Sequence, residues 1–265
     1  MANNSSRVIF DKASIAGQTA ASFCSMWRAT GQPAQGAIPA AAATCNSSTV
    51  GCIGFAQQTA PSSSYMTILE GINSNSAMTF EIHDRLAHMG GLSGIVTTAQ
   101  SVGIDLSTLL ATDNIDARKG DANYSDVQWW LEWYTATGAT VATATVAVTY
   151  NDGTTGNLTA QSLAATRPGS HMIPLNGLIP AGGKYIRAVT SVTLSVTTGT
   201  AGSFGVTATR YRGAILMPLA NARYSSDWAA LGLPEILNNS CLFAIILTST
   251  TSTGTLRATG KISHG

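Results

Sequence analysis

The second half of the chain alternates apolar and polar residues, a pattern typical of strands with one buried face. From Ala142 to Tyr150 apolar residues stand at nearly every second position, and threonine fills most of the others. The sequence NDG at 151–153 then marks a turn, and a similar alternation over 191–197 precedes a Gly-rich loop and a strand from Phe204. Because side chains on a strand point alternately to its two sides, these stretches predict two hairpins, each with one side in a core.

Two other stretches are apolar on both sides and predict strands that are covered on both faces. Trp129 and Trp133 share one face of a strand whose other face carries Trp130, and residues 241–249 form a nearly continuous apolar run. Short strands separated by Gly-rich turns, with little helix between them, are typical of antiparallel sandwiches. Residues 121–265 are therefore predicted to form an antiparallel β-sandwich of jelly-roll type.

The first 120 residues lack this alternation. Residues 1–61 are rich in Ala, Gly, Ser and Pro, and they predict an extended N-terminal arm that lies over its own domain or reaches onto a neighbour. Residues 62–120 carry apolar side chains at helical spacing, for example Met66 and Leu69, and predict a small α-rich segment. We expect a mainly β protein composed of the arm (1–61), the α-rich segment (62–120) and the sandwich (121–265).

Charge is scarce in this sequence. Asp, Glu, Lys and Arg make up 10% of the 265 residues, whereas about 25% is usual in globular proteins. The formal net charge is +1, and no Lys/Arg cluster marks a groove for phosphates, so we expect no direct nucleic-acid partner. Since a weakly charged surface protects a protein poorly from association, the composition favours a chain that packs into an assembly.

The sequence also indicates in which cellular compartment the protein is expected. No apolar run reaches the length of a membrane span, and the first residues lack the features of a secretory signal, so we expect no membrane partner and a protein that stays where it is made. Cys24, Cys45, Cys52 and Cys241 do not have the spacing of zinc or redox motifs, and we expect buried thiols. A Cys45–Cys52 bridge stays open for a protein that meets oxidising conditions.

The most reactive side chains lie together in the sequence EIHDRLAH, from Glu81 to His88. On a helix Asp84 and His88 would share one face and could share a hydrogen bond or a metal ion. No third ligand is identifiable, and His83 and His88 stand five residues apart, not the four of an H-E-x-x-H site. The pattern favours a salt-bridged helix end, and we expect neither a metal nor a cofactor.

Two further motifs lack the offsets that catalysis or metal binding needs. GGLSG at 90–94 does not have the glycine spacing of a nucleophile elbow. Asp113, Asp116 and Asp121 lack the alternating oxygen ligands of a calcium loop, and they favour turns or helix caps. We expect no catalytic residue and a protein that is not an enzyme.

Two features point weakly to sugars. If the protein were a glycosidase, Asp126 and Glu132 would be the candidate pair of catalytic carboxylates. Trp129, Trp130 and Trp133 resemble the stacking platform of a carbohydrate-binding module, but aromatic residues two positions apart on a strand are more often core, because their burial is strongly stabilising. The core interpretation is favoured, and sugar binding stays an alternative.

Several segments resemble virion structural proteins of tailed bacteriophages. They include IHDRLAHMGGLSGIVTTAQSV (82–102), TRPGSHMIPL (166–175) and LPEILNNSCLFAIIL (233–247). This group resembles the β-sandwich decoration or cement proteins that lie over joints between capsomers. The resemblance implies a protein made in the host cytoplasm that binds the major capsid protein on the outer head surface, clamps neighbouring capsomers and assembles as a homotrimer or similar ring.

The arm and the tryptophan-rich strand carry the largest apolar features without an evident partner in the sequence, and we expect contacts between subunits there. The residues are Phe23, Met26, Trp27, Ile53, Phe55, Trp129, Trp130 and Trp133. The alternative is a tail- or collar-associated binding module whose tryptophans contact carbohydrate. A hydrolase that unites His83 or His88 with an acid ranks last.

Overall fold

The computed structural model describes residues 5–163, 166–180 and 182–265. The chain is mainly β, with 48% strand and 7% helix, in antiparallel sheets of which one is barrel-like. It divides into unit 1 (Met1–Ala37, Cys45–Arg85 and Tyr211–Gly265) and unit 2 (Ile38–Thr44 and Leu86–Arg210). The units are interleaved along the chain, because the long strands β6 (Met78–Leu92) and β14 (Ser203–Met217) each contribute residues to both.

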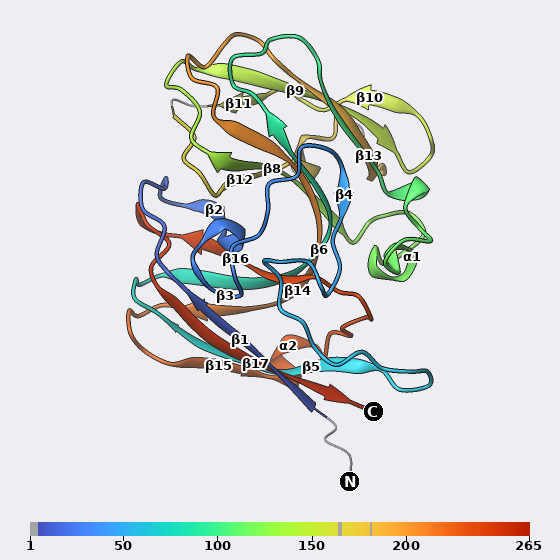
Figure 1. Ribbon diagram of the computed structural model, residues 1–265, viewed down its shortest axis with the longest axis vertical. Helices are drawn as coiled ribbons and strands as arrows, with labels where there is room; N and C mark the ends of the chain where they lie inside the picture. The colour runs from blue at the N-terminus through green and yellow to red at the C-terminus, as the bar shows by residue number, and fades with distance from the viewer. Residues whose placement is uncertain (1–4, 164–165, 181) are drawn as a thin grey trace. The chain divides into compact units, whose positions relative to one another are not determined.

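Unit 1 contains a sheet that we call the terminal sheet, since it includes β1 and β17 (Figure 1). Its strands, in spatial order, are β15 (Tyr224–Asp227), β5 (Ser64–Asn73), β17 (Leu256–His264), β1 (Ser5–Lys12) and β3 (Gly31–Gln32). Alternate residues of β1, such as Val8 and Phe10, are buried with Leu69 and Ile262 in one apolar cluster. The opposite residues of β1 are exposed, so this sheet buries one side only.

The rest of the unit 1 core comes from a second set of strands. These are β2 (Ser22–Ser25), β16 (Leu242–Thr248) and the first part of β6, with the short helices η1 (Met26–Arg28) and α2 (Trp228–Leu231). β16 pairs with β2 and β6 on its two edges, and its side chains are almost all buried. Phe80 and Ile246 join the same cluster as Phe10. The prediction of a doubly covered strand near 241–249 is confirmed.

Unit 2 is built from two sets of strands around a second apolar cluster. The first set is β10 (Thr155–Asn157), β9 (Ala142–Tyr150), β13 (Ile186–Leu194) and β7 (Gln100–Asp105), with β11 (Gln161–Leu163) also on β9. The second is β12 (His171–Pro174), β8 (Val127–Thr135) and β14, and β4 (Ala43–Thr44) pairs with β6. Short helices are η2 (Leu106–Thr108), α1 (Ile115–Arg118) and η3 (Asn176–Leu178).

The predicted α-rich segment at 62–120 is wrong. Strands β5, β6 and β7 occupy most of it, and the helices that the structure describes there are the single turns η2 and α1. The cause is a bulge in β5, where the register against β17 shifts between Lys261 and Ile262. Met66 and Leu69, three residues apart, therefore both point into the core and imitate helical spacing.

The predicted extended arm at 1–61 is also wrong for its first part. β1 pairs along its whole length with β17, from Ser5 opposite Ser263 to Lys12 opposite Leu256. Its buried Val8 and Phe10 make it a strand of the unit 1 core. No helix in the described part of the chain is long and apolar enough to cross a membrane.

Candidate interaction surface

Most of the residues expected at subunit contacts lie inside their own unit. The buried ones are Met26, Trp27, Ile53, Trp129, Trp130 and Trp133, while Phe23 and Phe55 are partly exposed. Trp27 packs edge-on against Phe243 with ring centroids 6.1 Å apart, and its indole donates to the carbonyl of Ala37 at 2.9 Å. Because their own chain covers these six side chains, they are not expected to contact a neighbour, which corrects the prediction.

The tryptophans of β8 have internal hydrogen-bond partners. The indole of Trp129 donates to the Ile186 carbonyl at 2.9 Å, and that of Trp130 donates to the Thr209 hydroxyl at 2.9 Å. The indole of Trp133 donates to the Thr137 hydroxyl at 3.2 Å. The rings of Trp133 and Phe204 also stack, with centroids 5.4 Å apart. These indoles are core residues and offer no exposed platform for a sugar.

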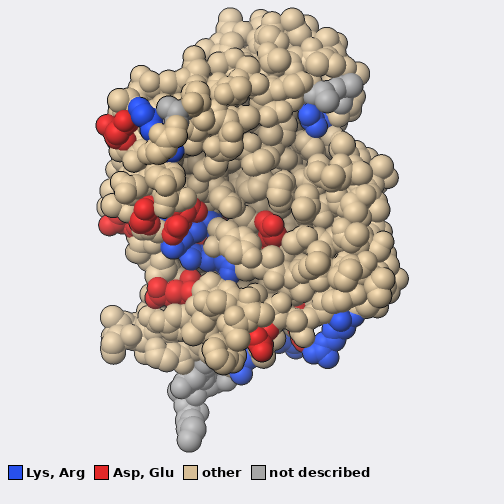
Figure 2. All heavy atoms as spheres, turned by 180° about the vertical axis from the view of Figure 1, so that it is seen from behind, with Lys and Arg blue, Asp and Glu red and all other residues tan. Residues whose placement is uncertain are grey.

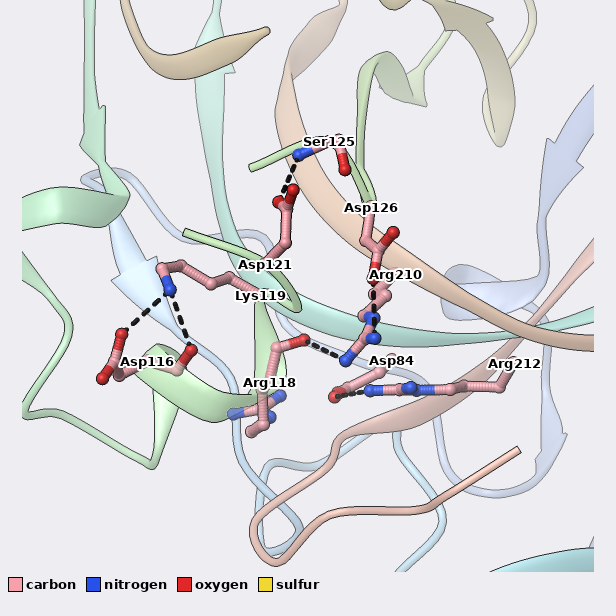
Figure 3. Close-up of polar contacts among 9 residues, drawn as sticks. All are labelled: Asp84, Asp116, Arg118, Lys119, Asp121, Ser125, Asp126, Arg210 and Arg212. Atoms are coloured by element: carbon pink, nitrogen blue, oxygen red, sulfur yellow. Dashed lines mark hydrogen bonds and ion pairs between the residues drawn. The ribbon is translucent and has the colours of Figure 1, made fainter. Parts of the chain in front are cut away.

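The sequence EIHDRLAH lies on β6, a strand, so the predicted helix end is wrong. Residues four apart on a strand are about 13 Å apart, too far to share a metal ion. In unit 1, His83 lies 2.8 Å from the Glu81 carboxylate, and Asp84 accepts a hydrogen bond from the Cys241 amide at 2.8 Å. Asp84 also faces Arg212 at 3.8 Å (Figure 3). The Arg85 guanidinium lies over the Trp27 ring, 4.4 Å from its centroid.

In unit 2 the remaining candidates are held apart. Glu132 is buried and accepts from Thr207 at 2.5 Å and from the Tyr134 hydroxyl at 3.4 Å. The same hydroxyl lies 3.4 Å from His88 Nδ1. Asp126, by contrast, is exposed and pairs with Arg210 at 2.7 Å (Figure 3). The two acids of the glycosidase reading therefore have different environments and different partners.

Two of the three aspartates of the 113–121 region make local contacts typical of turns. Asp116 pairs with Lys119 at 2.9 Å, and Asp121 accepts from the Ser125 amide at 2.8 Å (Figure 3). The latter hydrogen bond lowers the pKa of Asp121. Asp113 accepts from Thr44 at 2.7 Å.

The four thiols are buried, and they form no disulfide within the described residues. Burial raises the pKa of Cys24 to about 12. The pKa of Cys241 is raised well above its ordinary value by burial and by hydrogen bonds with Cys45 and Cys52. A Cys45–Cys52 bridge is not present, and the raised pKa values of Cys24 and Cys241 keep those two thiols protonated.

Sequence reasoning missed the exposed side of the terminal sheet, which we call the charged face. The paired registers arrange its outward residues in rows across β15, β5, β17 and β1. The first row holds Asp227, Ile68, Lys261 and Arg7; the middle row Ser225, Glu70, Thr259 and Ile9; the last row Ile72, Arg257 and Asp11. Arg223, the residue before β15, lines one hollow together with the last row. In Figure 2 charged atoms gather in a few groups, one of them at the lower end, where Figure 1 places these strands.

Acidic and basic groups on this face are partly paired with each other. Arg223 contacts Glu70, and this hydrogen bond is the largest cause of the lowered pKa of Glu70. Arg257 lies 3.4 Å from Asp11. Ile9 is nevertheless 47% exposed and Ile68 40% exposed, so apolar side chains stand in water among the charges.

The charged face is hollowed. A hollow of about 340 Å³ lies between Ile9, Ile72, Arg223 and Arg257, and one of about 400 Å³ is lined by Arg7 and Lys261 among others. Part of the signal was present in the sequence, since Arg7, Ile9 and Asp11 alternate with buried residues. The strands that complete the face come from distant parts of the chain, so their pairing could not be read from the sequence.

No family model and no curated protein matches this chain. The solved structures that it resembles weakly include VP2 of infectious bursal disease virus in T=1 particles of a mutant, with 10% identity over 98% of this chain and 76% of that chain and a TM-score of 0.17. A VP2 subviral particle gives 12% identity over 98% and 79%, with a TM-score of 0.19. These weak structural neighbours are viral capsid proteins, but likeness at such TM-scores carries no argument about this chain and assigns it to no family.

Proposed function

We propose that this protein is a non-enzymatic structural component of a tailed-phage particle, a decoration or cement protein on the outer surface of the head. The observation that carries the proposal is the contrast between its interior and its surface. The residues with catalytic chemistry that the structure describes in EIHDRLAH and β8 make contacts within their own units. The charged face is an exposed sheet surface with two hollows, and its mixed charges and exposed isoleucines suit contact with another protein.

The resemblance of segments 82–102, 166–175 and 233–247 to phage virion proteins supports the same proposal. The jelly-roll arrangement, the major capsid protein as partner and a trimer or similar ring formed on the particle belong to it. Strand ladders hold each unit rigid through backbone hydrogen bonds, which suits a subunit that must resist outward pressure. A stable contact with capsomers needs about 1,600 Å² of buried surface.

Gold-labelled antibodies against the folded chain, applied to intact particles of the phage that encodes it, test this proposal. Label over the head surface is the expected result. Label on the tail or collar would favour the alternative, a binding module, which would then need aromatic residues other than the buried tryptophans of β8. Particles without label, and without peptides of this chain in mass spectra, would overturn the proposal.

A second experiment tests the clamping role. Particles made without the gene should assemble, and they should release DNA at a smaller osmotic or thermal challenge than complete particles. Adding back the purified protein should restore resistance. Unchanged resistance of the deficient particles would contradict a cement role.

A further inference from the structure

The charged face carries charges of both signs near opposite edges of the terminal sheet. The β1 side of the face presents Arg7 and Asp11, the latter next to β3, and the β15 side presents Asp227 and, just before β15, Arg223. Across the face the two sides have opposite signs: Arg7 shares the first row with Asp227, and Asp11 of the last row lines one hollow with Arg223. When two such faces are placed against each other with their sides exchanged, each basic residue at one side of the face meets an acidic residue of the other copy.

We propose that the charged face binds a second copy of this chain, face to face, about a two-fold axis that runs parallel to the strands between β5 and β17. Such an axis exchanges β15 with β1 and β5 with β17, and it keeps each row opposite itself. Arg7 then faces the partner's Asp227, and Asp11 faces the partner's Arg223. In a two-fold interface every contact occurs twice, so four ion pairs form.

The middle of the face also fits this axis. The aliphatic stems of Lys261 and Arg257 come to lie over the partner's Ile68 and the partner's Ile72, which removes apolar surface from water. Glu70 comes to lie opposite the partner's Thr259. No like charges are opposed among the residues of the three rows.

The other in-plane two-fold axis, perpendicular to the strands, is disfavoured by charge. It would pair Arg7 with the partner's Asp11 and Asp227 with the partner's Arg223, but it would also place Glu70 opposite the partner's Glu70 and Lys261 opposite the partner's Arg257. Like charges directly opposed are destabilising. Charge complementarity therefore selects both the occupant, a second copy, and the direction of the axis.

The size of the face sets the expected strength. Strands β5, β17 and β1, of eight to ten residues each, together with the four residues of β15 and the two of β3, cover about 500 Å² in each copy, or about 1,000 Å² for the pair, at about 4.8 Å between strands and about 3.3 Å per residue. That is just below the range of specific interfaces, which begins near 1,200 Å². We therefore expect a reversible dimer that weakens with salt, because much of its complementarity is electrostatic. The hollows between the rows give room for partner side chains.

Sedimentation of the purified full chain tests the interface without any other virion component. At micromolar concentration and about 50 mM salt we expect a species of twice 27.3 kDa. A dissociation constant about tenfold larger at about 500 mM salt is expected from screening. A monomer at all concentrations up to about 100 µM, or a trimer without a dimer, would overturn the two-fold contact and would leave the virion role to its own experiment.

Charge exchange across the axis is the sharper test. Asp11→Arg and Arg223→Asp should each weaken the dimer at least about tenfold, and the double variant should regain it. Within one copy the two charged groups lie near each other, since Arg223 contacts Glu70 on β5 and Asp11 lies 3.4 Å from Arg257 on the adjacent β17. The contact between copies is therefore read from an equimolar mixture of the two single variants, which should dimerise although neither variant does so alone. Asp227 is left unchanged because its Oδ1 caps α2.

The matched control is Asp152→Arg, which breaks an exposed pair with Lys184 in unit 2 and should leave dimerisation unchanged. If either single reversal fails to fold by circular dichroism, mixed Ile9→Cys and Ser225→Cys variants replace it. These should form a disulfide between copies under an added oxidised thiol reagent such as oxidised glutathione, which is reduced to two thiols, and neither variant alone should. A double variant that stays monomeric, or mixed cysteines that do not cross-link, contradicts the proposed axis.

Discussion

Lys12 shows what burial does to a single charge in this protein. Its side chain is 1% exposed, and the ammonium donates to the carbonyls of Ala29 at 3.0 Å and Pro33 at 2.6 Å. Carbonyl dipoles replace only part of the lost water, so burial lowers the pKa from 10.5 to about 8. The residues around Lys12 do not indicate this burial, because the strands that pair with β1 come from other parts of the chain.

The Lys12 pKa predicts a rise of stability with pH. Above pH 8 the folded chain has released the proton while the unfolded chain holds it up to about pH 10.5. The unfolded state then binds more protons, so the free energy of unfolding increases through this window, by at most about 3 kcal/mol. Urea unfolding at pH 7.5 and 9.5 measures it, and the increment should shrink in Lys12→Met. An equal increment in both proteins would contradict the assignment.

The pKa of His171 predicts a loss of stability at acidic pH. It is 3% exposed, and burial, with a smaller contribution from the Arg167 charge, lowers its pKa from 6.5 to about 4. Arg167 Nη1 lies 3.1 Å from its Nε2, which suits a neutral ring. As pH falls from 6.5 to 4 the unfolded chain takes up a proton that the folded chain refuses, and up to about 3 kcal/mol of stability is lost.

Urea unfolding of the wild type and His171→Gln at pH 7 and 4.5 tests this. The substituted protein should lose less stability over the interval. The imidazole signals in NMR spectra give an independent check, since the His171 resonance should not titrate near pH 6.5.

At the scale of elements, alternation predicted strands well where one side is buried and the other exposed. β9 was expected from Ala142 to Tyr150 and is found with those bounds. β6 was missed because its residues from Ile82 to Gly90 are all buried, charged ones included, which hides any period of two. β5 was missed because its bulge imitates a helix.

Substitutions at two adjacent residues of β1, one buried and one exposed, test its role as a core strand. Phe10 is 1% exposed and packs edge-on against Phe80 with centroids 5.4 Å apart, whereas Ile9 is 47% exposed on the charged face. Phe10→Ala should cost about 3–5 kcal/mol of unfolding free energy, and Ile9→Ala less than about 1 kcal/mol. Urea unfolding compares them. Similar small losses would mean that β1 is the loosely held arm that composition suggested.

At the scale of the whole molecule, the candidate surface was less predictable than the fold. The charged face combines residues near 7–11, 68–72, 223–227 and 257–261, and only strand pairing brings them together. The sequence indicated large apolar residues for the interface, but burying these residues in the core of their own chain is strongly stabilising, so they are not available to a neighbour. The scarcity of charge favoured association in general but could not locate a surface, because exposed charges such as Asp116, Asp126 and Asp152 also lie in unit 2.

The distribution of tryptophans over the molecule predicts its fluorescence. Of the five tryptophans, Trp27, Trp129, Trp130 and Trp133 are at most 3% exposed, while Trp228 is 59% exposed. Acrylamide should quench a minor, accessible fraction of the emission, and Trp228→Phe should abolish that fraction. Strong quenching that persists in Trp228→Phe would show that the β8 tryptophans are accessible, as a sugar-binding platform requires.

The buried thiols have a practical consequence. A thiol reagent reacts with the thiolate, and burial keeps Cys24 and Cys241 protonated and shielded. One cysteine placed on an exposed loop, such as Asp152→Cys, should therefore take up a maleimide-linked fluorophore or gold cluster selectively in the folded protein. Because no native cysteine has to be replaced, this single substitution gives a site-specific label for locating the subunit in an assembled particle.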